Sequence, residues 1–274
     1  MPAPLPSDRK YTPSTYGESF ADVYDDWYHD VSDVEACVAA LSRLADGDPV
    51  LELGVGTGRL ALPLLRTGTP VVGIDASPSM LAVLSRKHDA DLLPTYEGDM
   101  ATIDQPPLAD QLAHHGPFGM VFAAFNTFFN LTSDDAQARC LRGAHQLLRP
   151  GGWLVIEGFV PPADGLNAGG VSVRSITDDA AVLTVSRHDA ATQLIEGHHI
   201  DIRADGTRLR PWKIHYRRPH QLDDDALSAR FELAHRWRDW DQTPFPEHSI
   251  AAESTIEAEP EVHISIYRKP TEGP

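Results

Sequence analysis

Three glycines alternate with other residues directly after a short apolar segment. Val50–Leu53 is apolar apart from Glu52, and Gly54, Gly56 and Gly58 follow it. Glycine lets the backbone make tight turns and pass close to a ligand. A helix that begins at such a turn offers unpaired amide donors to that ligand. The segment therefore predicts a nucleoside- or nucleotide-binding loop, with a ligand-free turn as the alternative.

The residue after the third glycine separates two classes of nucleotide-binding enzyme. A dinucleotide fingerprint has glycine or alanine at the sixth position of G-x-G-x-x-G/A. Arg59 occupies that position here, which disfavours a nicotinamide-dependent oxidoreductase. Asp75 follows the next apolar segment, and an acid about 20 residues after the first glycine accepts hydrogen bonds from ribose hydroxyls. The two features together favour a nucleoside ligand.

The pattern E-x-G-x-G-x-G resembles the nucleoside-binding loop of class I S-adenosylmethionine-dependent methyltransferases. The resemblance implies that the loop passes under the methionine and ribose parts of S-adenosylmethionine, and that Asp75 binds the ribose. Gly98-Asp99-Met100 is similar to the adenine site of this family, which implies an acid for the exocyclic amine and a side chain packed on the ring. The implied cofactor-binding residues are Tyr16, Glu52, Gly54, Gly56, Gly58, Asp75, Ala76, Met80, Asp99, Met100 and Phe125.

The segment around Phe125 follows the fourth apolar segment, where this family places the reactive methyl group and the acceptor. Aromatic faces attract cations, so Phe125 is expected to form a wall beside the sulfonium. The alternative is that these aromatic residues only pack in the core. The residues expected to contact the acceptor are Tyr28, Asn126, Phe128, Glu157, Trp212 and Tyr216.

Tyr24, Phe125 and His215 are the residues expected to take part in catalysis. Tyr24 lies in an aromatic segment that resembles the lid of small-molecule methyltransferases, where a tyrosine binds the cofactor carboxylate or orients the acceptor. His215 is of a type that accepts a proton near neutral pH, although a surface histidine is the alternative. Glu157 is a second candidate base. Because the sulfonium is already activated, positioning is expected to supply most of the catalysis.

These residues must be held by elements that alternate between strand and helix, which implies a parallel sheet with right-handed crossovers. Open sheets of this kind bind ligands at the carboxyl ends of their strands. The expected strands of the sheet are residues 49–53, 70–74, 93–96, 118–123, 153–159, 236–240 and 262–268. Helices are expected over 20–28, 34–44 and 222–234, and an antiparallel insertion over 171–217.

The predicted fold class is α/β: a doubly wound, seven-stranded, mostly parallel Rossmann-like sheet with an antiparallel β insertion and an N-terminal helical lid. We expect residues 1–48 to form an arm and lid helices, and 49–160 to form the cofactor-binding core. Residues 161–220 are expected to form the insertion on the acceptor side, and 221–274 to complete the sheet. Residues 1 to about 30 are expected to be mobile without ligand and to close over the cofactor.

Charge and composition limit the partners. The chain has 40 acidic and 23 basic residues, a formal net charge of −17 that repels nucleic acid and anionic membrane surfaces. Two cysteines and an N-terminus without an apolar run predict a cytoplasmic protein. Adjacent histidines such as His198-His199 lack metal-ligand spacing, so no metal is expected. A homo-oligomer is compatible with the sequence.

A second, looser resemblance is to small-molecule N-methyltransferases of actinobacterial antibiotic pathways, which act on amino sugars and lincosamide-type amines. It implies methyl transfer to an amine nitrogen of a natural product. Three alternatives stay open: a small-molecule O-methyltransferase, a non-catalytic S-adenosylmethionine-binding protein, and a methyltransferase for a basic peptide.

Overall fold

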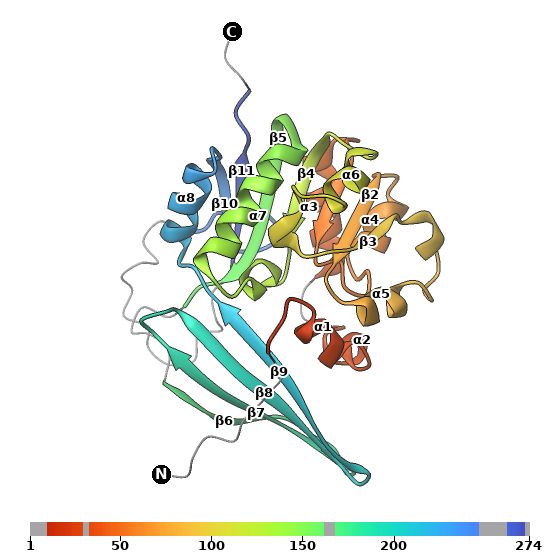
Figure 1. The fold of residues 1–274 in the computed structure, drawn as a ribbon, viewed down its shortest axis with the longest axis vertical. Coiled ribbons are helices and arrows are strands. Elements are labelled where there is room, and N and C mark those ends of the chain that lie inside the picture. Colours follow the sequence, from red (N-terminus) through yellow and green to blue (C-terminus); the bar gives the residue numbers. More distant parts are fainter. Residues whose placement is uncertain (1–9, 30–32, 162–167, 247–261, 272–274) are drawn as a thin grey trace.

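Two sheets organise the computed structural model, which describes residues 10–29, 33–161, 168–246 and 262–271. The larger sheet has seven strands in the order β10-β11-β5-β4-β1-β2-β3, and the smaller has four in the order β6-β7-β8-β9. Helices cover the larger sheet, and the smaller sheet extends away from one end of it (Figure 1). The predicted α/β fold with an antiparallel insertion is confirmed.

The larger sheet is parallel from β3 to β5 and antiparallel at β11 and β10. Strands β1 and β4 are buried along their whole length, because helices pack on both faces of the sheet. The strands are β1 Val50–Leu53, β2 Val71–Asp75, β3 Thr95–Glu97, β4 Phe118–Ala123, β5 Leu148–Phe159, β10 Glu232–Trp237 and β11 Val262–Arg268.

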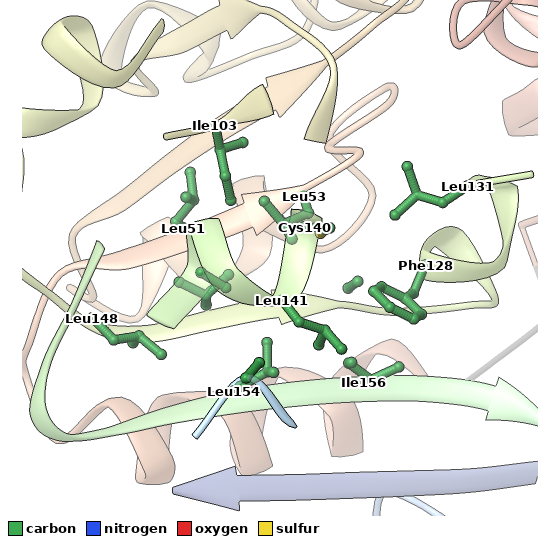
Figure 2. Packing of buried hydrophobic residues seen from close by; sticks show 14 of the residues in the cluster. Leu51, Leu53, Ile103, Phe128, Leu131, Cys140, Leu141, Leu148, Leu154 and Ile156 are labelled. Atoms are coloured by element: carbon green, nitrogen blue, oxygen red, sulfur yellow. The ribbon is translucent and has the colours of Figure 1, made fainter. Parts of the chain in front are cut away.

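Two apolar clusters fill the two sides of this sheet. On one side, Leu141 from the helix α7 lies near Leu154 and Ile156 of β5 (Figure 2). The α-helices packed around the sheet are α3 Val34–Ala45, α4 Ala61–Arg66, α5 Pro78–Leu84, α6 Leu108–Ala113, α7 Asp134–Leu147 and α8 Pro219–Ser228. Three short 3-10 helices connect them: η1 Ala90–Leu92, η2 Met100–Thr102 and η3 Thr127–Asn130.

The insertion is the four-stranded antiparallel sheet of β6 Gly169–Ile176, β7 Ala180–Asp189, β8 Leu194–Arg203 and β9 Gly206–His215. Its edge strand β6 is exposed along its whole length. One face of the sheet carries His199 and Arg210, which are buried against the N-terminal helices. The insertion therefore shares an interface with the segment expected to form a lid.

The N-terminal segment forms two short helices, α1 Thr15–Phe20 and α2 Tyr24–Trp27, where the spacing predicts one helix over 20–28. Val23 leaves the helical region at φ −127° and ψ −3°. Phe20, Val23 and Tyr28 pack together with Met80 of α5 around this bend. Tertiary packing has overridden the helical periodicity. Residues 1–9 of the expected arm lie outside the described residues.

Two boundaries near the C-terminus also differ from the prediction. The helix expected over 222–234 ends at Ser228, because Arg230 has a φ of +68° that a right-handed helix cannot include. The strand expected over 236–240 runs from Glu232 to Trp237, since Leu233 already pairs with Tyr267 of β11. Residues 247–261, between these two strands, lie outside the described residues.

Candidate functional site

A cavity opens at the carboxyl ends of β1, β2 and β3, under the N-terminal helices. This is the edge at which parallel sheets bind ligands. Its lining residues are Tyr11, Thr12, Pro13, Tyr16, Gly17, Tyr24, Gly54, Gly56, Asp75, Ala76, Met80, Gly98, Asp99, Met100, Thr127, Asn130, Leu131, Thr132 and Ala136. The lining therefore includes nine of the residues expected to bind the cofactor or to act on the methyl group.

The glycine loop after β1 forms the floor of the cavity. Gly54 has a φ of +69°, and a Cβ atom there would lie 2.4 Å from Cγ2 of Thr127. Gly56 has a φ of +54° and faces open space. Only glycine adopts these backbone angles without strain. The loop can consequently pass close under a ligand.

Asp75 ends β2 and connects it to the glycine loop. Its Oδ2 atom accepts the N–H of Gly56 at 2.8 Å, and its Oδ1 atom accepts the N–H of Ser77 at 2.8 Å. Burial raises the pKa of Asp75, and these two hydrogen bonds oppose the shift. Each carboxylate oxygen has a second lone pair, so Asp75 can still accept hydrogen bonds from the two hydroxyls of a ribose.

Beside β3, the cavity combines one acid with apolar side chains. Oδ1 of Asp99 accepts the N–H of Ala101 at 2.9 Å, which fixes the carboxylate at the start of η2. Met100, Leu131 and Ala136 supply apolar surface. An acid beside apolar walls can bind the exocyclic amine of a purine while the ring packs on the side chains.

Glu52 lies buried in β1, two residues before Gly54, and is not part of the cavity lining. Its Oε2 atom has no hydrogen-bond partner among the described residues. Burial raises the pKa of Glu52 to about 8, with Arg59 opposing the shift and Asp75 adding to it. A buried carboxyl oxygen without a donor suits the ammonium group of a ligand's methionine part.

Tyr16 and Tyr24 cover the cavity from the N-terminal helices. Burial raises the pKa of Tyr24 to about 12, and it raises the pKa of Tyr16 well above its usual value, with Tyr28 and Tyr24 adding to the shift. Both hydroxyls keep their protons near neutral pH and can donate hydrogen bonds. This matches the expected place of both tyrosines, while the mobility of the segment stays a prediction.

The two N-terminal helices, α1 and α2, form the cover of the cavity, and α1 packs closely against α5. A Cβ atom on Gly17 would lie 2.3 Å from Cβ of Ser77, so α1 approaches α5 as only a glycine allows. Glu18 then accepts hydrogen bonds from the hydroxyls of Ser77 and Ser79, both at 2.7 Å. These bonds lower the pKa of Glu18.

Two more acids of the N-terminal segment bind other elements. Asp25 accepts the hydroxyl of Thr57 in the glycine loop at 2.6 Å. Asp22 pairs with Arg210 of β9 at 2.5 Å. The segment is thus bonded to the floor of the cavity and to the insertion at once.

Phe125 lies two residues after the end of β4 with a φ of +49°, which is uncommon for a residue other than glycine. Its ring makes an edge contact with Tyr28, with 5.7 Å between centroids. The guanidinium of Arg59 lies 5.4 Å from the centroid of Phe125. Phe125 therefore sits between the N-terminal cover and the glycine loop, although it is not part of the cavity lining.

The structure places the other expected acceptor residues outside the cavity lining. Phe128 is part of the core, and Tyr216 is buried against Phe159. Trp212 packs beside His199 in the insertion. Glu157 and Asn126 make hydrogen bonds to the backbone around Phe125 and Phe159. The structure does not bring these residues together around one opening.

His215 and Gly58 also lie outside the lining. Nε2 of His215 lies 3.2 Å from Asp134. Burial lowers the pKa of His215, Arg217 adds to the shift, and Asp134 opposes it. Gly58 packs instead against Leu62 and Leu84 of the following helices. The arrangement favours a structural contact of His215 with Asp134 over a base at the cavity.

Several lining residues have no local signal in the sequence. Tyr11 lies in a proline-containing arm without periodicity, yet burial raises its pKa to about 12 and its hydroxyl accepts the N–H of Lys213 at 3.2 Å. Gly17 shows its role only through its distance to Ser77. The remaining unforeseen lining residues are Thr12, Pro13, Thr127, Asn130, Leu131, Thr132 and Ala136.

The described ranges contain neither a candidate metal-binding group nor a candidate membrane-spanning helix. No three His, Cys, Asp or Glu side chains there are grouped so that they could hold a metal ion. No helix in the same ranges is long and apolar enough to cross a membrane.

Comparisons with known proteins agree with this geometry. Residues 50–152 match the model of a methyltransferase domain family. The chain is 32% identical over 189 residues to the cypemycin N-terminal methyltransferase of a Streptomyces species, an alignment that covers 67% of this chain and 73% of the relative.

Solved structures extend the likeness over nearly the whole chain, including the insertion. The CcbJ methyltransferase from Streptomyces caelestis is 34% identical, with a TM-score of 0.80 over 95% of this chain and all of the other. The fold is shared with CalS10 of Micromonospora echinaspora, an amino pentose methyltransferase solved with S-adenosylmethionine, at 20% identity and a TM-score of 0.63 over 90% of this chain and 96% of that one. The cofactor is S-adenosylmethionine, and the chain belongs to the class I S-adenosylmethionine-dependent methyltransferases.

Proposed function

We propose that this methyltransferase transfers the methyl group of S-adenosylmethionine to an amine nitrogen of a small molecule. The observation that carries the proposal is the cavity at the strand ends, which Tyr16 and Tyr24 cover. Its lining residue Tyr11 accepts a hydrogen bond from Lys213 of the insertion. A covered cavity of this kind suits a small acceptor. The relative named as an N-terminal methyltransferase supports nitrogen as the acceptor atom.

The cofactor would lie with its ribose on Asp75 and its adenine between Asp99 and Met100. The orphaned oxygen of Glu52 would face the ammonium of the methionine part. Gly56 leaves the open space that such a ligand needs, and a side chain there would narrow it. Gly54, Ala76 and Met80 would complete the cofactor contacts.

S-adenosylmethionine supplies a methyl group that is already activated by the sulfonium. The contribution of the chain is therefore positioning and the exclusion of water. Phe125 would form an aromatic wall beside the methyl group, and Tyr24 and Tyr28 would orient the acceptor from the lid. Because burial raises the pKa of Tyr24 to about 12, its hydroxyl acts as a hydrogen-bond donor.

The acceptor atom decides how much base catalysis is needed. A neutral amine attacks through its own lone pair, whereas a hydroxyl needs a base. The structure pairs His215 with Asp134, outside the cavity lining. Since neither expected base, His215 or Glu157, is among the described residues that line the cavity, nitrogen is favoured over oxygen as the acceptor atom.

The experiment is a screen of amines and phenols for the release of S-adenosylhomocysteine. The amine set holds amino sugars, cyclic secondary amines and peptides with a free N-terminal amine, because of the N-terminal methyltransferase relative. We expect turnover with a small amine and none with phenols. Turnover only with phenols would replace the proposal by an O-methyltransferase. Binding without any turnover would favour a non-catalytic cofactor-binding protein.

A further inference from the structure

We propose that Glu157 and Trp240 are positioning residues that hold the ring of Phe125 at the methyl-transfer site. The inference rests on the proposed place of Phe125 beside the methyl group. Glu157 lies near the end of β5, and Trp240 follows β10. Glu157 would act through hydrogen bonds to the backbone of Phe125 and Asn126, and Trp240 through a hydrogen bond to the carboxylate of Glu157, without either residue touching the cofactor or the acceptor.

The backbone after β4 needs an external constraint. Phe125 and Asn126 are consecutive residues with φ values of +49° and +61°. Residues other than glycine rarely adopt this region, and they persist there only where the surroundings hold them. Such conformations cluster at functional sites.

Glu157 supplies this constraint from three of its atoms. Its Oε2 atom accepts the N–H of Phe125 at 2.6 Å, and its backbone carbonyl accepts the N–H of Asn126 at 3.1 Å. Its Oε1 atom accepts the indole N–H of Trp240 at 3.2 Å. The side chain of Asn126 closes the loop, since its Oδ1 atom accepts the N–H of Phe159 at 2.8 Å.

The carboxylate of Glu157 is buried, with 8% of the residue exposed. Burial raises its pKa, while the hydrogen bonds from Phe125 and Trp240 and the charge of Arg59 oppose the shift. Both oxygens already accept a donor from the protein. Glu157 is therefore occupied by the loop, and a contact with the acceptor is a less suitable role for it.

The constraint fixes the direction of the aromatic ring. The ring of Phe125 lies between Tyr28 of the cover and Arg59 of the glycine loop. The backbone nitrogen and the Cα atom that carries the side chain are bonded to each other. Rotation of the backbone at Phe125 would therefore also turn its ring out of the space between Tyr28 and Arg59. Trp240 orients the carboxylate from the opposite side, where it is buried in the core cluster with α3 and α4.

A glutamine at position 157 tests the two hydrogen bonds separately. Its amide oxygen can accept one N–H, but its NH2 group then faces the other donor. In Glu157→Gln, one of Phe125 and Trp240 loses its acceptor. In Glu157→Gln/Trp240→Phe, the indole donor is gone and the amide oxygen is available for Phe125. The double variant is therefore expected to recover part of what the single variant loses, while the orienting contact of Trp240 stays absent.

The readout is the ratio of the dissociation constants of S-adenosylhomocysteine and S-adenosylmethionine, measured by calorimetry. The two differ by the methyl group and the sulfonium charge, so the ratio needs no identified acceptor. Phe125→Leu keeps an apolar side chain without the aromatic face, and we expect it to lower the preference for S-adenosylmethionine about threefold to tenfold. Glu232→Gln changes an exposed carboxyl of β10 and is the matched control.

We expect Glu157→Gln to lower the ratio as Phe125→Leu does. The double variant should recover part of this loss and match Trp240→Phe alone, because both keep an acceptor for the N–H of Phe125 and lack the indole that orients residue 157. A loss in Phe125→Leu with an unchanged ratio in Glu157→Gln would overturn the positioning role and leave the place of Phe125 intact. An unchanged ratio in Phe125→Leu would overturn both the positioning role of Glu157 and the proposed place of Phe125 beside the methyl group. If Glu157→Gln does not fold, Trp240→Phe alone decides: a lowered ratio supports the inference, and an unchanged one contradicts it.

Discussion

The carboxylate of Asp75 accepts the backbone N–H of Gly56 at 2.8 Å, which ties the end of β2 to the glycine loop after β1. One acid thus fixes the shape of the loop and presents its remaining lone pairs to the cavity. The spacing between the glycines and this acid follows from the geometry of adjacent parallel strands. We therefore expect loop shape and ribose binding to depend on the same side chain.

Asp75→Ala is expected to weaken the binding of S-adenosylhomocysteine by about 1–3 kcal/mol, because charge-assisted hydrogen bonds to the ribose are lost. Titration calorimetry measures the change. Asp91→Ala, which removes an exposed carboxyl from η1, is the control and should bind normally. Equal affinities of Asp75→Ala and the unmodified protein would remove Asp75 from the binding site.

Gly17→Ala is expected to lift the N-terminal helices off α5, because the new Cβ atom would lie 2.3 Å from Cβ of Ser77. Amide exchange of residues 15–28 should become faster and cofactor affinity should fall. The sheet should stay folded, since the N-terminal cluster is separate from the two clusters of the sheet.

The control for this variant is Gly170→Ala, where a Cβ atom meets nothing within 4 Å. Hydrogen exchange with and without S-adenosylhomocysteine also tests the expected closing of the lid. Equal and strong protection of residues 16–29 in both states of the unmodified protein would show a fixed structural segment instead of a lid.

The sequence singles out nine of the residues that line the cavity, because their signals are local. The glycine pattern and Asp75 lie at strand ends whose order follows from the alternation of strands and helices. Tyr11 and Gly17 were not foreseen, since their roles depend on contacts with Lys213 and Ser77, which are distant in the chain.

The acceptor side was harder to predict for a physical reason. The direction of Glu157 depends on the path of β4 beside it and on Trp240 from beyond β10. A strand-end acid in a sequence suggests a contact for a ligand, but here the backbone N–H of Phe125 and the indole N–H of Trp240 occupy the two carboxylate oxygens. The side chain of His215 at the end of β9 lies beside Asp134 of α7. The alternation of residues along a strand cannot show which face of the strand this side chain occupies.

Glu52 predicts a pH dependence of stability in the protein without ligand. Its pKa is about 8 in the folded protein and 4.5 in the reference state, so the folded state keeps a proton that the unfolded state loses. The free energy of unfolding should therefore fall as the pH rises between these two values, relative to Glu52→Gln, by at most about 1.4 kcal/mol per pH unit. Urea unfolding of both proteins across this range measures the difference, and parallel pH profiles would contradict the assignment.

Chelation is expected to leave turnover unchanged. Among the described residues, no group of three His, Cys, Asp or Glu side chains could hold a metal ion. Turnover should be equal with and without EDTA, and added magnesium should not raise it. Inactivation by EDTA that magnesium reverses would show a metal-dependent site.

The most direct measurement of the central claim uses S-adenosylmethionine with a trideuterated methyl group and the amine acceptor found by screening. Mass spectrometry and NMR of the product locate the label. We predict one trideuteromethyl group on the amine nitrogen, with its formation abolished in Asp75→Ala and retained in Asp91→Ala. Label on oxygen or carbon, or no labelled product from any amine while S-adenosylmethionine binds, would contradict the proposed function.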